Sequence, residues 1–355
     1  MVGMTFKSPI HIYKYKLEKQ FKHIQTAHCE NGATTSLLRY HGLDFMTEPL
    51  AFGLGSGIFY IHIPFLQINN GPAISYRSMP GWIFSRTCKS LGVKVTRKKF
   101  GSNEAAAKAY LDQKIKEGIP VGCQVGVFNL PYFPPEYRFH FNAHNLIVWG
   151  KKDGNYLISD PVMETVTSLS EEDMIKVRFA KGPLAPKGHV YFPENVKAVS
   201  NEMIKKGIIK GIKRSARDML HIPGSIAGVD GIKYTAKQIR KWRDKLGPRK
   251  AGLYLGQVVR MQEEIGTGGG GFRFLYAAFL EEAHAYLKND ELLNISQDFT
   301  KVGDLWRSSA VQMGRIYKGR INNDQSDFVI CADLLTEIAD IEKEAFRKLK
   351  KLKLD

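Results

Sequence analysis

The residues best suited to covalent chemistry lie around Cys29, in the stretch His28-Cys29-Glu30-Asn31-Gly32 that opens a segment with helical character. The N-terminus of a helix carries partial positive charge, which favours the thiolate form of a cysteine and lowers its pKa. The thiolate is the attacking species in cysteine-based nucleophilic catalysis. The alternative is a packing role, because free cysteines also behave as small buried hydrophobic residues.

A histidine and an aspartate lie more than a hundred residues downstream, at the open ends of a predicted β-hairpin. His144 opens the first strand and Asp160 closes the second, with Asp153-Gly154 as a turn signal between them. A five-residue loop over 151–155 makes His144 and Asp160 diagonal neighbours on one face, roughly 7–8 Å apart at the backbone. A two-residue Asp-Gly turn shifts the register and places them on opposite faces.

A carboxylate beside a histidine fixes the tautomer of the ring and stabilises its charged form, which makes a competent base. The chain order cysteine, histidine, aspartate, with the cysteine before a helix and the other two across a hairpin, is the papain-type arrangement. Each residue alone is weak evidence, since strand-end histidines and Asp-Pro turns are usually structural. Together they indicate a cysteine-dependent catalytic site.

The chain resembles the butirosin biosynthesis protein H family over roughly residues 25 to 340. The residues that carry the resemblance are the segment from His28 to Gly42, Glu48-Pro49-Leu50-Ala51-Phe52-Gly53-Leu54-Gly55-Ser56-Gly57-Ile58, Leu130-Pro131-Tyr132, the hairpin from His144 to Asp160, and the run from Gly266 to Ala283. The last of these is similar to the helical domain that accompanies the N-terminal domain of the family.

That resemblance implies a papain-like fold akin to bacteriocin-processing cysteine peptidases, with Cys29 as nucleophile, His144 as base and Asp160 as the residue that orients it. The founding member of the family moves an acyl group from an acyl carrier protein thioester to an amine of an aminoglycoside. For this chain we expect an acyltransferase that works through an acyl-Cys29 intermediate in secondary-metabolite or lipid biosynthesis, with a small-molecule amine or hydroxyl as acceptor. No cofactor is expected beyond the phosphopantetheine of the carrier protein.

Two alternatives to acyl transfer stay open. A cysteine hydrolase would use the same three residues on a peptide, an amide or a thioester, with water in place of the acceptor. A basic binding module would carry out no chemistry, and it gains support if Cys29 is buried far from His144.

The oxyanion of an acyl transfer is expected to face the backbone N–H of Cys29 and one side-chain donor. Gln25 and His28 are the candidate donors, with His23 as a further one. Papain-type enzymes place a glutamine before the cysteine, and here Gln25 lies four residues before it, at a shorter spacing.

A glycine run over 266–271 precedes a predicted helix that contains Arg273. Backbone N–H groups in such a loop can bind an anion. Candidate contacts for the phosphate of a phosphopantetheine arm are therefore Gly268, Gly269, Gly270 and Arg273. A flexible connection between two helices is the alternative interpretation.

The 355 residues suit two domains with buried cores, and the contents of 43% hydrophobic and 25% charged residues are ordinary for a globular protein. The four cysteines, at 29, 88, 123 and 331, form no CxxC pair and no metal-ligand spacing with histidines, so we expect no metal site. Sparse cysteines suit a reducing cytosol, and the first 25 residues lack the apolar core of a signal peptide. We therefore expect a cytoplasmic protein.

The formal net charge is +17, and it is concentrated locally. Residues 201–250 hold 14 basic and 4 acidic residues, a net of +10, and residues 51–100 hold no acidic residue. Such a surface attracts acidic partners, and acyl carrier proteins are acidic. A basic patch also suits nucleic acid or anionic lipid. We expect no nucleic acid, and we leave membrane association and a homo-oligomer open.

We predict an α+β, papain-like catalytic domain over residues 1–195 and an all-helical domain over 196–355. In the first, an arm over Phe6–Tyr15 precedes the Cys29 helix. The uncharged stretch Leu50–Ile68 is interpreted as a glycine-rich turn and a buried strand at 58–63 rather than a membrane helix. A proline-containing loop, Leu130–Pro135, is expected to form a wall of the cleft.

The remaining elements follow from hydrophobic spacing and from start and stop signals. In the first domain we predict helices over 81–91, 104–117 and from Ser170, and strands over 93–95, 119–127 and 188–192. In the second we predict helices over 196–220, 235–246, 251–265, 272–288, 292–318 and 326–352.

Overall fold

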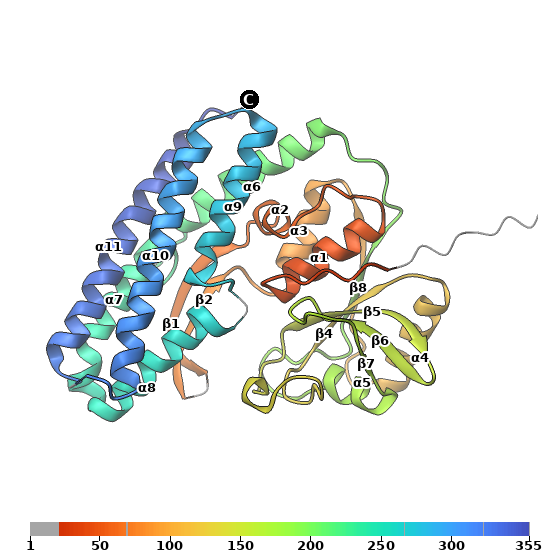
Figure 1. Cartoon of the computed structure of the whole chain (residues 1–355), viewed down its shortest axis with the longest axis horizontal. Coiled ribbons are helices and arrows are strands. Elements are labelled where there is room, and N and C mark those ends of the chain that lie inside the picture. Colours follow the sequence, from red (N-terminus) through yellow and green to blue (C-terminus); the bar gives the residue numbers. More distant parts are fainter. Residues whose placement is uncertain (1–20, 69, 266, 322, 355) are drawn as a thin grey trace, which may run out of the picture.

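The computed structural model describes residues 21–354, with the exception of residues 69, 266 and 322. An α+β half is followed by a helical half that begins at Asn201 (Figure 1), which confirms the fold class expected from the sequence. The arm predicted over Phe6–Tyr15 lies outside the described residues. Among the described residues, no helix combines the length and the apolar character needed to cross a bilayer.

The α+β half is built on a six-stranded antiparallel sheet with the order β3-β8-β4-β5-β6-β7. One face packs against α1 (Cys29–Tyr40), and the other face packs against α4 and α5, whose bounds follow. The elements are β3 (Lys94–Lys98), α4 (Glu104–Lys116), β4 (Val121–Val125), β5 (His144–Lys152), β6 (Asn155–Ser159), β7 (Thr167–Leu169), α5 (Glu171–Arg178) and β8 (Val190–Glu194).

A short helix occupies the first part of the stretch where we predicted a glycine-rich turn. Helix α2 spans Glu48–Leu54, so the turn is shorter than predicted and comprises Gly55 and Ser56, shortly before the strand. Thr47 caps this helix by accepting a hydrogen bond from the backbone N–H of Leu50 at 3.1 Å. Gly53, inside the helix, serves helix packing, because a Cβ there would overlap the ring of Phe279 in the helical half.

The strand prediction after this helix is confirmed and extended. Strands β1 (Ile58–Ile68) and β2 (Gly71–Arg77) form a separate antiparallel pair that packs against α7 (Gly228–Leu246) and α8 (Pro248–Val259). The backbone N–H of His62 also donates to the carbonyl of Ile226 at 2.9 Å. One hydrophobic core therefore runs through both halves, and the boundary predicted at residue 195 does not separate two independent cores.

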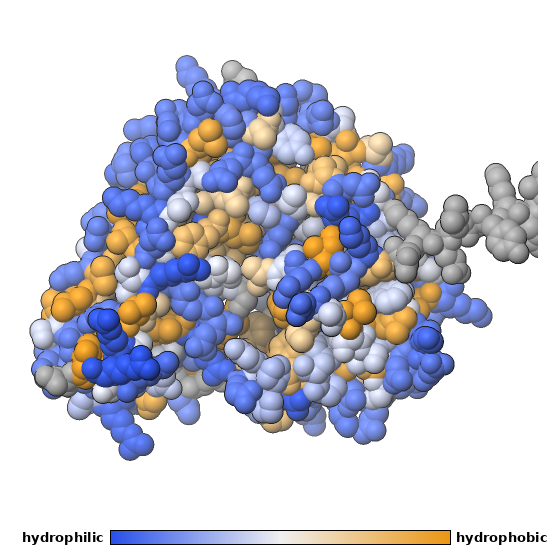
Figure 2. Space-filling view, viewed as in Figure 1, coloured by the Kyte–Doolittle hydropathy of each residue, from blue (hydrophilic) through white to orange (hydrophobic). Residues whose placement is uncertain are grey.

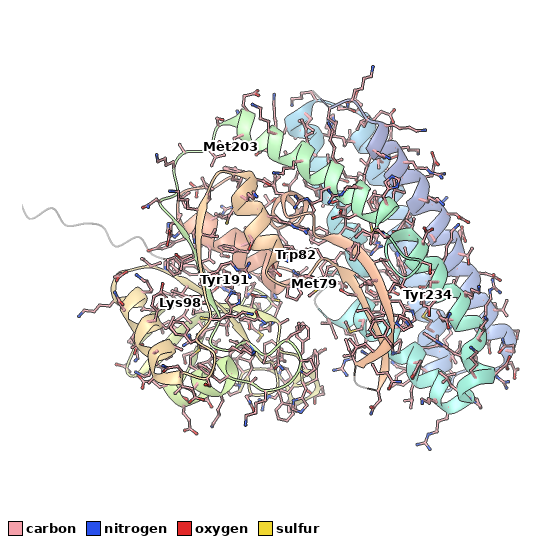
Figure 3. The ribbon with its side chains drawn as sticks, turned by 180° about the vertical axis from the view of Figure 1, so that it is seen from behind. Met79, Trp82, Lys98, Tyr191, Met203 and Tyr234 are labelled. Atoms are coloured by element: carbon pink, nitrogen blue, oxygen red, sulfur yellow. The ribbon has the colours of Figure 1, made fainter. Side chains whose placement is uncertain are left out.

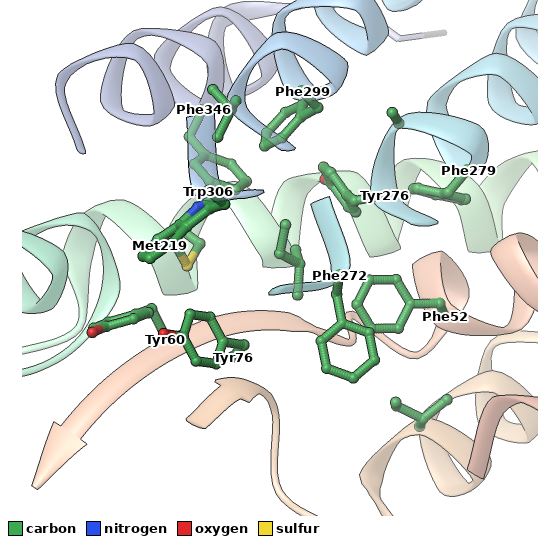
Figure 4. Packing of buried hydrophobic residues seen from close by; sticks show 14 of the residues in the cluster. Phe52, Tyr60, Tyr76, Met219, Phe272, Tyr276, Phe279, Phe299, Trp306 and Phe346 are labelled. Carbon is green, nitrogen blue, oxygen red and sulfur yellow. The ribbon is translucent and has the colours of Figure 1, made fainter. Parts of the chain in front are cut away.

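The helical half packs its long helices around large aromatic side chains (Figure 4). Trp306 is fully buried and stacks on Tyr60 of β1, with ring centroids 5.9 Å apart. Phe299 lies edge-on to Phe346 at 5.0 Å. The remaining helices are α3 (Trp82–Ser90), α6 (Asn201–His221), α9 (Arg273–Leu287), α10 (Glu291–Tyr317) and α11 (Gln325–Lys351).

Candidate active site

Cys29 is the first residue of α1, a helix that lies between the sheet and the helical half of the molecule (Figure 1). Its backbone N–H belongs to the first turn, so it has no partner within the helix. The chain before it is held by Glu48, whose carboxylate accepts hydrogen bonds from Ala27 N at 2.9 Å and His28 N at 2.8 Å. The position of the thiol is therefore set by α2 as well as by α1.

A buried ion pair next to the thiol joins α1 to the start of α3. Glu30 is fully buried and pairs with Arg77, the last residue of β2. Its carboxylate also accepts hydrogen bonds from Gly81 N at 3.0 Å and Phe84 N at 3.2 Å. Since a negative charge at a helix N-terminus is stabilising, the residue that follows Cys29 anchors two helices at once.

The register of the hairpin follows neither of the two alternatives that we considered. Asp153 and Gly154, both with positive φ, form a two-residue turn, and this turn pairs Gly150 with Leu157. A β-bulge between Val148 and Gly150 then shifts the pairing by one residue, so that Ile147 lies opposite Ser159. The bulge restores the register of the longer loop, and His144 and Asp160 fall on the same face.

His144 and Asp160 are in direct contact. The Nε2 atom of His144 lies 2.7 Å from an oxygen of Asp160, and both side chains are buried. The same oxygen accepts a hydrogen bond from the Tyr132 hydroxyl at 2.8 Å, and the other oxygen accepts one from Val162 N at 3.2 Å. The Asp160 carboxylate is thus fully engaged, and the second nitrogen of His144 is left for Cys29.

The charge state of His144 is set by its neighbours. Burial by itself lowers the pKa of His144, but the charges of Asp160 and Cys29 and a hydrogen bond to each raise this pKa to about 10. The imidazolium is therefore the resting form at neutral pH, facing the sulfur on one side and a carboxylate on the other. Burial raises the pKa of the three other thiols, to about 12 for Cys88 and Cys331 and about 11 for Cys123.

Asn145 is a site residue that we did not predict from the sequence. Its Nδ2 lies 3.7 Å from the sulfur of Cys29, and its Oδ1 accepts a hydrogen bond from the buried Tyr191 hydroxyl at 2.9 Å. The amide is therefore oriented with its nitrogen toward the thiol, and the same nitrogen also donates to the carbonyl of Ala143 at 3.1 Å. The only sequence signal was its place next to His144, because the contact with Cys29 depends on how α1 lies on the sheet.

The predicted oxyanion donors lie in three different environments. Gln25 is exposed. The ring of His28 is buried, with Nδ1 3.3 Å from Asn31 N and Nε2 2.7 Å from the guanidinium of Arg77, so it caps α1 and both ring nitrogens are engaged. His23 contacts Ser159 and the carbonyl of Met163 instead, at 2.8 and 3.1 Å. The roles of Gln25 and His28 as donors stay predictions.

Two of the three backbone donors predicted to bind an anion at the glycine run are engaged within the protein. The N–H of Gly270 donates to Glu263 at 3.1 Å, and that of Gly269 donates to Thr267 at 3.1 Å. Gly268 is the exposed member, and a Cβ added there would lie 3.2 Å from Ala27. The loop therefore lies against the chain just before Cys29. Figure 2 shows a hollow near the centre of one face of the molecule.

Arg273 is also unsuited to bind an anion, because the protein interior already neutralises its charge. It is fully buried, and its Nε and Nη2 atoms donate to Glu342 at 2.8 and 2.9 Å. The third donor, Nη1, reaches the carbonyl of Gly271 at 2.7 Å, and Trp306 donates to the same Glu342 at 2.9 Å. This arginine holds α9, α10 and α11 together.

Replacement of Arg273 by methionine is expected to lower the free energy of unfolding by about 3–5 kcal/mol, because Glu342 would be left buried without a charge partner. Chemical denaturation measures this loss. The matched control is Lys348→Met, which removes the exposed pair between Lys348 and Asp298 and should cost less than about 1 kcal/mol. Equal losses in the two variants would contradict the structural role of Arg273.

Comparison with known proteins gives two family matches and likenesses to solved structures. Residues 28–161 match the model described as butirosin biosynthesis protein H, N-terminal, and residues 172–349 match the domain of unknown function DUF4872. No curated protein matches the chain. A crystal structure described as a C39-like peptidase from Bacillus anthracis aligns with 15% identity over 51% of this chain and 97% of that chain, with a TM-score of 0.34. At that TM-score the likeness supports no conclusion about activity.

Proposed function

Because this chain belongs to the DUF4872 family and carries an N-terminal domain of the butirosin biosynthesis protein H type, we propose that it transfers an acyl group from an acyl carrier protein thioester to an amine or hydroxyl acceptor. The single observation that supports this most strongly is the buried contact of His144 with Asp160, with Cys29 at its other side. The first matched family is named after a biosynthetic protein, which favours transfer over hydrolysis.

In the first half of the reaction, the Cys29 thiolate attacks the carbonyl carbon of the thioester. The new carbon–sulfur bond forms as the carbonyl electrons move to oxygen, and the oxyanion lies near the Cys29 N–H and the Asn145 amide. When this intermediate collapses, the bond to the phosphopantetheine sulfur breaks. The imidazolium of His144 gives its proton to that leaving sulfur, which leaves acyl-Cys29 and a neutral histidine.

In the second half, the acceptor nitrogen or oxygen attacks the acyl-Cys29 carbonyl. His144 now takes the proton of the acceptor as a general base, and Asp160 stabilises the imidazolium that forms. Collapse of the second intermediate releases the acylated product and restores the Cys29 thiolate. No external oxidant or reductant is needed, because the carbonyl carbon keeps the oxidation level of a carboxylic acid throughout.

The Asn145→Ala variant tests the oxyanion contact. We expect kcat to fall about 10²- to 10³-fold with a small change in KM, because a donor to the developing oxyanion acts mainly in the transition state. The control is Tyr191→Phe, which removes the hydroxyl that orients the amide but keeps the amide itself, so its loss should be much smaller. If Asn145→Ala raises KM and leaves kcat unchanged, the amide binds substrate rather than the oxyanion.

Intact-mass spectrometry tests the proposal as a whole. The protein is mixed with acyl carrier proteins and with acyl-pantetheines that carry aminoacyl, fatty acyl or aryl groups, and then with amine and hydroxyl acceptors. A mass gain equal to the acyl group, discharged faster by an acceptor than by water, supports transfer. Discharge by water at an unchanged rate in the presence of every acceptor would instead support a cysteine hydrolase.

A further inference from the structure

A surface of cations and exposed apolar side chains extends from α3 to α6, and no step of the proposed reaction uses it. Trp82, Arg86 and Lys89 are four and three residues apart, so they lie along one side of α3. The guanidinium of Arg86 stacks over the Trp82 ring, 4.1 Å from its centroid. We use the name α3–α6 surface for Met79, Trp82, Arg86, Lys89, Lys210 and Arg214.

Four of these residues bring positive charge to one small pocket. The pocket is lined by Ser56 and Ser90 and by the cations Arg86, Lys89, Lys210 and Arg214. None of the four cations forms an ion pair with any residue that the structure describes, whereas the nearby Arg217 is paired with Asp218. Like charges that are held together without a direct ion pair favour the arrival of an anionic group.

The charge on Arg86 shows the effect of this crowding. Partial burial and, after it, the positive charge of Arg214 lower the pKa of Arg86. The charge of Asp218 raises it, and smaller contributions come from Arg217, which lowers it, and Glu30, which raises it. An anionic side chain in the pocket would relieve that repulsion. The exposed residues Lys89 and Lys210 lie at its rim, where their charges act on an approaching partner.

The surface begins next to the proposed nucleophile. The guanidinium of Arg77 lies 2.7 Å from His28 Nε2, pairs with Glu30 and donates to the carbonyl of Met79 at 3.4 Å. His28 and Glu30 are the two neighbours of Cys29 in the chain, so a single side chain separates Met79 from the thiol region. Figure 3 shows Met79 and Trp82 together where the two halves of the molecule meet.

We infer that the acyl carrier protein docks on the α3–α6 surface, with its acidic side chains on the cations and its phosphopantetheine arm passing Met79 toward Cys29. This inference rests on the proposed function, because it presupposes a carrier-bound donor. Met79 and Trp82, 53% and 45% exposed, provide the apolar anchors that charged rims usually surround in protein interfaces. An apolar anchor beside a catalytic thiol suits a protein partner better than nucleic acid, whose backbone binds through charge alone.

The test compares two donors that carry the same acyl group, one on an acidic acyl carrier protein and one on free pantetheine, which has neither protein nor phosphate. The variant is Lys89→Glu combined with Lys210→Glu. We expect its KM for the carrier-bound donor to rise about ten- to a hundredfold at low salt relative to the pantetheine donor, with kcat little changed. The difference should shrink at high salt because screening weakens the charge contacts.

The matched control is Lys237→Glu combined with Lys241→Glu, which makes the same charge change at two exposed positions on α7. An equal rise in KM in this control would show that net charge rather than the α3–α6 surface governs binding, and would overturn the inference. So would an unchanged KM in the Lys89 and Lys210 variant, or tight binding of a DNA duplex that the same variant loses. If the wild-type protein forms no adduct even with acyl-pantetheine, the proposed function itself fails, which is a separate outcome.

Discussion

Substitution of Cys29 by alanine is expected to abolish the acyl-enzyme and to lower the rate of transfer roughly 10⁴-fold or more, because no other group can take over the covalent step. The change removes one sulfur atom from a side chain that is 6% exposed, so the fold should persist. Intact-mass spectrometry after incubation with an acyl donor should show the mass gain in the wild-type protein and none in Cys29→Ala.

The matched control is Cys123→Ala, which removes a fully buried thiol in β4. Its mass gain and rate should match those of the wild-type protein apart from a modest loss of stability, since burial keeps that thiol protonated. A mass gain that survives in Cys29→Ala and disappears in Cys123→Ala would sink the assignment of the nucleophile. Circular dichroism and the unfolding midpoint of both variants separate loss of chemistry from loss of fold.

Replacement of Asp160 by asparagine should reduce kcat/KM about 10²- to 10⁴-fold and should change its pH profile. Burial lowers the pKa of His144, but the charge of Asp160 is the main opposing effect and the pKa is raised to about 10. The imidazolium that protonates the leaving sulfur is therefore present below pH 10 and is lost above it. The wild-type rate should therefore fall as the pH rises through about 10. Without the Asp160 charge, this alkaline limb should move to lower pH.

The control for this prediction is Tyr132→Phe, which removes one hydrogen bond to Asp160 and leaves the carboxylate charge in place. Its alkaline limb should stay near the wild-type position, and its rate should fall by less than about tenfold. If the limb does not move in Asp160→Asn, a group other than His144 sets it. Measurement of kcat/KM with acyl-pantetheine avoids any pH effect on a protein partner.

Much of the local structure could be predicted from the sequence, because it depends on residues that are close in the chain. Asn103 and Ser170 begin helices by accepting hydrogen bonds from Ala106 N and Asp173 N, as their residue types suggest. The family resemblance is likewise confirmed by the matched segments. The turn predicted from Leu50 onward is shorter than expected, because Gly53 lies inside α2 and packs against Phe279 of another helix, which leaves Gly55 and Ser56 as the turn.

The site divides in the same way. Cysteine at a helix start and histidine and aspartate at hairpin ends are matters of residue type and spacing, so the sequence alone was enough to single out Cys29, His144 and Asp160, whose catalytic roles stay predictions. Whether His144 faces Asp160 depended on the β-bulge at Trp149. A one-residue shift of register of this kind cannot be predicted from residue types.

Only the tertiary structure decided which long-range partners the remaining polar residues have. Arg273 resembles an anion ligand in sequence, yet it is paired with Glu342, 69 residues away, and Asn145 reaches Cys29 across 116 residues. Local sequence patterns determine which segments are helix or strand and which reactive residues stand at their ends. Packing in three dimensions determines which charges neutralise one another, because a buried charge takes whichever opposite charge the fold brings next to it.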